Sequence, residues 1–366
     1  MNQQLLNSVL FRLSASLLII LPATCFSAIQ CNIAPPLKED VMTISANITV
    51  GADTPVGTVV YKARYVSSGY ESINCNASNY SVENWVDYFN IPSADAGIYL
   101  PGYGKVYNTN LPGLGVAITG TGNGQSFPRM EETWRENQSI KHAYTLWIIK
   151  TGTVSPGTLN GSSLPSVRSY AAEKSGYSGL PFDVLHLRFA GAIHVISETC
   201  KTSDINVNLG KYETARYFKG KGSTTPWVDS SIILADCPAF KGYYNRVNSS
   251  VNITGSGVTP AGNPDPNSLS VSIKPLQSIV DTMNGIMTVS SDAGSNAALG
   301  IGIQIGWGAA SDSPVPFNLC QPKTFSPPAD GRTSFKIPLA ARYIQTDDHV
   351  SPGKADGRVI FTINYY

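Results

Sequence analysis

The chain has 366 residues, a formal net charge of +1 and only 14% charged residues, with 33 glycines and 24 prolines. A charge this close to zero excludes an electrostatic basis for binding nucleic acid or an anionic membrane surface. The length is compatible with two domains or with one large all-β domain.

The first 28 residues predict a cleaved secretory signal. Arg12 precedes the apolar run of residues 13–21, which is followed by Pro22 and small residues up to Ala28. This run is too short to span a bilayer, and no other stretch is long and apolar enough to do so. A retained N-terminal anchor is the alternative. We therefore expect residues 1–28 to be removed and the mature chain to remain outside any membrane.

Export places the chain in an oxidising compartment. Removal of the signal leaves Cys31, Cys75, Cys200, Cys237 and Cys320. Their order favours the pairs Cys31–Cys75 and Cys200–Cys237, each stabilising by roughly 2–4 kcal/mol, although sequence alone does not settle the connectivity. Cys320 is left over, either as a free buried thiol or as a competitor for one of these pairings.

Short β-rich runs bounded by Gly, Pro, Asn, Asp and Ser recur along the chain, and helical periodicity is almost absent. Many short strands between turn residues predict antiparallel β-sandwiches. In the run 184–189, His186 and Arg188 share a polar face, and a separate strand follows at 193–196. A boundary near residues 197–199 is expected to divide a first domain, residues 29–197, from a second, residues 200–366.

Sequence motifs of common enzymes and metal sites are missing. The chain has no Gly-x-Ser-x-Gly, Cys-x-x-Cys or His-Glu-x-x-His, and its four histidines are scattered. Glu131 and Glu132 are adjacent and would face apart on a strand, which is a poor arrangement for a paired-carboxylate glycosidase. We therefore expect no catalytic residue, no metal and no cofactor. A secreted hydrolase is retained as the less favoured alternative.

The second domain resembles, in five segments and in order, the pilin domain of subunits assembled by the bacterial chaperone–usher pathway. The segments are residues 200–210, 231–238, 297–305, 335–343 and 353–366. The end of the chain strengthens the resemblance. Tyr365 is the penultimate residue and Gly353 is the 14th from the end, the positions at which such subunits carry Tyr and Gly.

This resemblance implies an incomplete pilin sandwich that lacks its last strand and has an apolar groove beside the terminal strand. A periplasmic chaperone would fill the groove first, and the adjacent fimbrial subunit would replace it at the outer-membrane usher. Val359, Phe361, Ile363 and Tyr365 would supply the apolar contacts, with Gly353 part of the same site. The alternative is a strand that closes an ordinary sandwich.

An ordinary pilin has only a short donor strand where this chain has its first domain. The arrangement is similar to the two-domain tip adhesins of chaperone–usher fimbriae, such as the type 1 and type 3 fimbrial adhesins. The resemblance implies two immunoglobulin-like or jelly-roll-like β-sandwiches. It also implies a first domain that binds a host glycan or matrix protein at the fimbrial tip outside the cell. The alternative is a structural adaptor or minor subunit without an external ligand.

Two stretches of the first domain, residues 83–90 and 129–138, combine aromatic rings with polar side chains, as sugar-binding and protein-binding surfaces do. A Gly-rich loop with tyrosines lies between them. The candidate ligand-binding residues in these three places are Trp85, Asp87, Tyr88, Tyr103, Glu131, Trp134, Arg135 and Asn137. Each also fits an ordinary role in the core or a loop of a sandwich, so sugar and protein ligands are not separable on composition.

Overall fold

The computed structural model describes residues 28–34, 36–91, 93–120, 125–245, 251–254, 257–259, 263–290 and 296–366. The expected signal, residues 1–28, lies outside the described residues except for Ala28. The architecture is almost entirely β, as predicted: the helices in these ranges are α1 (Thr214–Tyr217) and the 3-10 helix η1 (Gly161–Ser163). Neither is long and apolar enough to cross a membrane.

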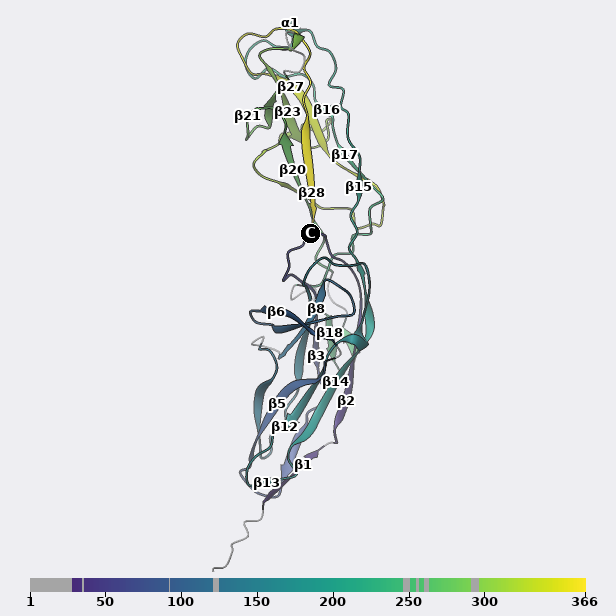
Figure 1. Ribbon diagram of the computed structural model, residues 1–366, viewed down its shortest axis with the longest axis vertical. Coiled ribbons are helices and arrows are strands. Elements are labelled where there is room, and N and C mark those ends of the chain that lie inside the picture. The colour runs from purple at the N-terminus through teal and green to yellow at the C-terminus, as the bar shows by residue number, and fades with distance from the viewer. Residues whose placement is uncertain are drawn as a thin grey trace, which may run out of the picture.

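Two large sheets pack face to face in the first half of the molecule, the lower half in Figure 1. The six-stranded sheet has the order β11 (Gly157–Asn160), β14 (Phe182–Ile196), β12 (Ser166–Ala171), β5 (Ser81–Asn90), β9 (Arg129–Arg135), with β2 (Lys38–Thr49) parallel to β14. The seven-stranded sheet has the order β19 (Gly257–Thr259), β18 (Val251–Thr254), β3 (Val59–Val66), β10 (Ala143–Lys150), β8 (Leu114–Gly120), β7 (Gly104–Asn108), β6 (Asp95–Leu100).

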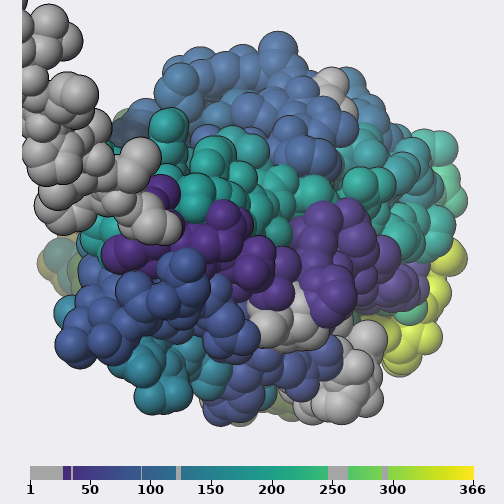
Figure 2. All heavy atoms as spheres, turned by 90° about the horizontal axis from the view of Figure 1, so that it is seen from below, coloured from purple at the N-terminus to yellow at the C-terminus, as the bar shows by residue number. Residues whose placement is uncertain are grey.

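A small third sheet lies at one end of this sandwich, with the order β13 (Tyr177–Ser178), β1 (Ile29–Ala34), β4 (Ser72–Cys75). Figure 2 looks onto the end of the first half that faces away from the second. The purple N-terminal segment crosses the middle of this end, between segments that come later in the chain. The first strands of the described chain are therefore built into the sandwich rather than trailing from it.

Alternating side chains form the core between the large sheets. In β2, Met42, Ile44 and Ile48 are at most 1% exposed, and Thr43 and Asn47 between them face solvent. This is the period of two that a strand with one buried face requires. Strand β8 is the exception, because it is buried along its whole length. Its outer face is covered by a smaller cluster that includes residues of β6 and β7.

The second half is a smaller sandwich built from three sheets. Their orders are β15 (Lys201–Thr202), β17 (Ile232–Ala235), β26 (Phe335–Ile337); then β16 (Val228–Asp229), β27 (Leu339–Gln345), β23 (Ile301–Trp307), β22 (Ile286–Thr288), β21 (Ile279–Asp281), with β24 (Val315–Pro316) on β23; and β25 (Lys323–Phe325), β20 (Leu269–Pro275), β28 (Val359–Tyr365). Its main core cluster takes residues from all three sheets, including Leu234, Val271 and Ile305.

Both disulfides favoured by the sequence are present. Cys31–Cys75 joins β1 to β4, and Cys200–Cys237 joins the residues next to β15 and β17. Cys320 is free, but it is exposed, so the expectation of a buried thiol is wrong. The residue lies on the loop between β24 and β25, where no core packing covers it.

The two halves are joined by more than the connecting chain. Strands β18 and β19 come from the second half of the sequence, yet β18 pairs in parallel with β3 and extends the sheet of the first half. The buried Asn267 donates to the main-chain oxygens of Thr49 (2.8 Å) and Tyr366 (3.2 Å). The C-terminus therefore lies at the junction of the two halves, as Figure 1 shows.

Candidate functional site

The C-terminal strand β28 is paired on one side only. Its antiparallel partner is β20, and among the described strands no second partner joins it. Phe361 and Ile363 pack half-buried against the core, Tyr365 is buried, and Val359 remains 37% exposed. Burial raises the pKa of the Tyr365 hydroxyl, opposed by its hydrogen bond to the backbone of Cys200. The far edge of β28 thus offers main-chain groups for pairing beside a row of apolar side chains.

A second strand-like segment borders the same sandwich without a partner. In residues 203–209, Ile205, Val207 and Leu209 are turned toward the core while the residues between them are exposed. This is again the burial period of a strand. No described strand pairs with residues 203–209, however, and Ile205 packs on the same cluster as Phe361 and Ile363. Two unpaired extended segments therefore border the sandwich and meet at the cluster of Ile205, while Val207 and Leu209 pack on a separate cluster.

The C-terminal end of β28 is closed by the first half of the molecule. The amide of Tyr365 donates to the Asp53 carboxylate at 2.8 Å, and the amide of Asp53 donates to the Tyr365 carbonyl at 3.0 Å. A Cβ at Gly51 would lie 2.1 Å from that carbonyl oxygen, so only glycine permits this approach. The buried Lys150 holds the loop from beneath by donating to the carbonyls of Gly51 and Ala52. A strand added to β28 must therefore leave from the Val359 end.

Gly353 lies outside the row of groove residues with which it was grouped. It precedes β28 and packs against the backbone of residues 296–298, where a Cβ would come within 2.4 Å of the Ala298 nitrogen. The next residue, Lys354, forms a parallel bridge with Ala297. The glycine is thus explained by a close approach of two main chains, and its part in strand addition stays a prediction.

Three of the eight candidate ligand residues point into the sandwich. Trp134 is completely buried in the cluster beneath the small sheet. The Tyr88 hydroxyl bonds both backbone groups of Ile118 inside the main core. Glu131 faces the buried residue His142. A surface ligand cannot reach Trp134, and the strand register explains why: Trp134 is directly opposite the buried Val82.

The other five lie on three separate surfaces. Tyr103 packs edge-on against Trp147 on the outer face of the seven-stranded sheet. Arg135 ends β9, and Asn137 forms the turn after it with a φ of 59°. Trp85 and Asp87 share the third surface, since alternate residues of β5 lie on the outer face of the six-stranded sheet.

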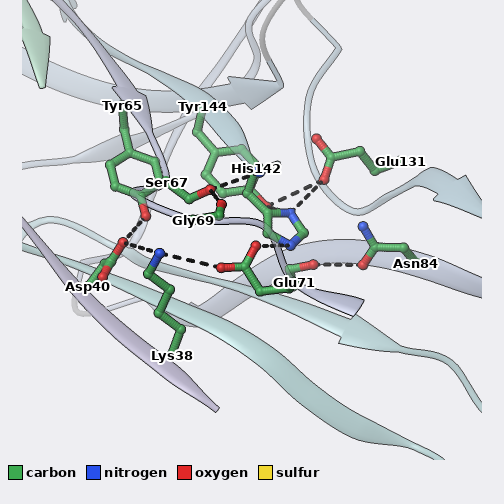
Figure 3. Close-up of polar contacts among 11 residues, drawn as sticks. Lys38, Asp40, Tyr65, Ser67, Gly69, Glu71, Asn84, Glu131, His142 and Tyr144 are labelled. Atoms are coloured by element: carbon green, nitrogen blue, oxygen red, sulfur yellow. Dashed lines mark hydrogen bonds and ion pairs between the residues drawn. The ribbon is translucent and has the colours of Figure 1, made fainter. Parts of the chain in front are cut away.

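A network of charged and hydroxyl groups lies inside the first half, between its two main core clusters (Figure 3). Lys38 approaches Glu71 at 3.4 Å and Asp40 at 3.7 Å. The two ring nitrogens of His142 lie 3.7 Å from Glu71 and 3.5 Å from Glu131. Glu71 and His142 are at most 1% exposed. Buried charges of this kind are tolerated only when they are paired.

This network fastens a loop at the outer end of the molecule. Ser67 exchanges hydrogen bonds with the backbone of His142, and Glu71 forms a two-way backbone pair with Ile140. The loop between Ser67 and Glu71 exposes Tyr70 to solvent. Because Glu71 and His142 are shut off from solvent, this acid–imidazole pair cannot meet a polymeric substrate. Its arrangement fits a structural role.

Two tyrosines of this network predict a loss of stability at alkaline pH. Burial, and then the hydrogen bond to Asp40, raises the pKa of Tyr65, while burial and the charge of Glu131 raise the pKa of Tyr144. Such a tyrosine ionises in the unfolded chain above pH about 10 but stays neutral in the folded chain. Stability is therefore complete below pH 10 and falls above it by about 1.4 kcal/mol per pH unit for each tyrosine.

Urea unfolding between pH 8 and pH 11 measures this slope. Tyr144→Phe should make it shallower, and Tyr99→Phe, at a 70% exposed position, should leave it unchanged. Equal slopes for the wild type and Tyr144→Phe would show that Tyr144 does not contribute.

The sequence of the second half decides its family. Residues 187–366 match the family model described as Fimbrial protein. This part of the chain is a fimbrial protein domain. The predicted resemblance is thereby confirmed for this range. The fimbrial domain contains both unpaired segments, residues 203–209 and β28, so the open edge belongs to it.

Solved structures similar to the whole chain include the CupB6 tip adhesin of Pseudomonas aeruginosa. Its TM-score is 0.36 and its identity 15%, over 92% of this chain and 94% of that chain. The receptor-binding domain of the adhesin MrkD1P of Klebsiella pneumoniae has a TM-score of 0.30 and 21% identity, over 47% and 97%. The P pilus rod subunit PapA has a TM-score of 0.31 and 14% identity, over 46% and 100%. No curated protein matches the sequence.

Sequence reasoning missed several residues around these sites. Nothing in the sequence marks Asp53 as the group that caps β28 of the fimbrial domain, because the two are far apart in the chain. Arg168 and Tyr170 were also missed, although a signal exists. They alternate with the buried Val167 and Ser169, so they had to share an outward face.

Proposed function

We propose that the chain is a fimbrial tip adhesin. In this proposal the fimbrial domain anchors the molecule by accepting a strand, and the first half binds a ligand on a host surface. The observation that carries the proposal is the one-sided pairing of β28 together with the unpaired, alternating segment 203–209. A secreted chain with such an edge needs a partner strand to avoid aggregation.

Strand addition supplies what this edge lacks. An extended segment between β28 and residues 203–209 would satisfy main-chain groups on both sides. It would also place alternate apolar side chains on the core that Phe361 and Ile363 border. We infer that a periplasmic chaperone provides this strand after export by the signal of residues 1–28. The adjacent fimbrial subunit would then provide it at the outer-membrane usher.

The first half is the part available for an external ligand, because the fimbrial domain is committed to assembly. A host glycan is the first candidate and a matrix protein the second. A structural adaptor without an external ligand would use the same edge, so binding by the first half separates the two functions. No step of the proposed function is catalytic.

If the fimbrial domain accepts a strand at the open edge, a charge introduced there should reduce chaperone binding. Ile205→Asp should reduce recovery of the chaperone-bound chain from the periplasm about tenfold, since Ile205 packs on the same cluster as Phe361 and Ile363 and burying a carboxylate there against the incoming strand costs more than 1.4 kcal/mol. The matched control is Asn206→Asp, the exposed neighbour, whose yield should equal the wild type.

Copurification with the coexpressed chaperone is the measurement, and intact disulfides with a wild-type circular dichroism spectrum establish that Ile205→Asp is folded. Equal recovery of the two variants would contradict strand addition at this edge.

A further inference from the structure

The outer face of the six-stranded sheet carries a row of large side chains that crosses three strands. Met130 of β9 is directly opposite Trp85 of β5, and Trp85 is directly opposite Tyr170 of β12. Directly opposed residues point to the same side of a sheet, with Cβ atoms about 5 Å apart. The Trp85 indole donates to Glu83 at 2.8 Å, which orients the ring. We name Met130, Trp85 and Tyr170 the apolar row.

A charged row runs parallel to it, across four strands. Asp87 of β5 is opposite Arg168 of β12, Arg168 is opposite His186 of β14, and His186 is opposite Glu39 of β2. The sign of charge therefore changes from strand to strand, apart from the titratable imidazole. Along β5 and β12 the two rows are only two residues apart, so they form one continuous surface.

Contacts within the surface hold its side chains in place. His186 bonds Glu39 at 2.7 Å and Asp183 at 2.8 Å through its two ring nitrogens. Phe89 stacks on the imidazole with ring centres 4.3 Å apart and stays 44% exposed. The Arg168 guanidinium lies 4.6 Å from the centre of the Tyr170 ring. The surface is thus ordered before any ligand arrives, which lowers the entropic cost of binding.

Most charges of this surface are already paired with one another. Arg168 lies 3.7 Å from Asp183, and Arg188 lies 3.7 Å from Glu39. Asp87 forms no ion pair with the described residues and accepts only from the amide of Tyr88, so the surface holds a free carboxylate that disfavours an anionic ligand. Its carboxylates retain acceptor positions and the guanidinium retains donors. Rings beside paired polar groups match a sugar, which has an apolar C–H face and a rim of hydroxyls.

We propose that this surface binds a neutral oligosaccharide, with sugar rings stacked on Trp85 and Tyr170 and hydroxyls bonded to Asp87 and Arg168. The inference rests on the proposed function, since it names the ligand class and the place of binding in the first half. The face is built from strands rather than from a loop pocket, so it suits a stretch of several sugar units.

The test uses the mature chain on an array of neutral oligosaccharides ending in mannose, galactose or N-acetylglucosamine, with sialylated counterparts and collagen on the same array. Trp85→Ala and Tyr170→Ala should each weaken binding to a neutral oligosaccharide about tenfold, the loss expected for one stacked ring. Tyr170→Phe should retain the affinity. Tyr99→Ala, which removes an exposed ring from β6, should bind like the wild type.

Tryptophan fluorescence gives a second readout. Saturating neutral sugar should change the emission of the wild type, and Trp85→Phe should lose that change. If both alanine variants still bind neutral sugar like the wild type, the inference is overturned but the proposed adhesive function is not contradicted. Binding only to sialylated sugars or collagen would do the same. A folded wild type that binds nothing on the array would overturn both the inference and the adhesive function.

Discussion

A mature chain extended beyond Tyr366 by a flexible Gly/Ser linker and a seven-residue strand of alternating valine and threonine should unfold about 10–20 °C higher than the unextended chain. The linker is long enough to pass around Asp53, which occupies the far edge at Tyr365, so the new strand runs antiparallel to β28 along the open edge from Ile363 past Val359. Four valines would contact the core, at about 1.5–3 kcal/mol each, and the strand would add main-chain hydrogen bonds. The entropy of ordering seven residues opposes this and leaves a net gain of about 5 kcal/mol.

Thermal unfolding followed by circular dichroism measures the gain. The matched control is the same extension with aspartate in place of valine, which keeps the length and the linker but cannot occupy an apolar site. If the valine and aspartate extensions melt at the same temperature as the wild type, β28 has no open edge and the fimbrial domain is already complete.

Trp134→Ala should lower the free energy of unfolding of the first half by about 3–5 kcal/mol, the cost of removing a large buried side chain. The reason is its position. Trp134 is 0% exposed and packs with Val82, Ile140 and Val184, so its removal leaves a cavity between β5, β9 and β14. Trp134→Phe should recover part of the loss, because the smaller ring still fills much of the site.

Trp85→Ala is the control for this second prediction. Its side chain lies on the outer face, so we expect a loss of about 1 kcal/mol or less. Urea unfolding of the three variants and the wild type makes the comparison. A similar loss for Trp85→Ala and Trp134→Ala would show that the outer ring, too, is part of the packing.

Local sequence patterns predicted most of the secondary structure but not where strands end. Residues 184–189 and 193–196 were expected as two strands, yet they form the single strand β14. Gly191 lies between them with a φ of 79°, and a Cβ there would come within 2.2 Å of the Ile44 carbonyl. The glycine that indicates a break in the sequence instead allows β14 to continue beside β2, because the partner strand fits closely against it.

The candidate ligand-binding residues show that local sequence patterns also do not predict which side chains are exposed. Glu131, Trp134 and Arg135 are close in sequence and equally suited to a binding loop. In the structure a register shift between β9 and β5 lets Glu131 and Trp134 both face the interior, whereas Arg135 at the end of β9 reaches solvent. Which face of β9 is covered depends on its pairing with β5, which lies far from it in the sequence, and on its contact with β10 of the other large sheet. Composition alone could not separate the two buried residues from the exposed one.

By itself the sequence determined the all-β class, the resemblance of residues 200–366 to a fimbrial subunit and the alternating face of the last strand, and it favoured the two disulfide pairs. These follow from short-range patterns: period two, turn residues, cysteine order and motif spacing. Only the tertiary structure decided which edge of β28 is open, that Asp53 and Asn267 hold its end, and that Trp85, Asp87, Arg168, Tyr170 and His186 share one surface. Each of these depends on strand pairing between residues distant in sequence, and local propensity carries no information about the partner or its register.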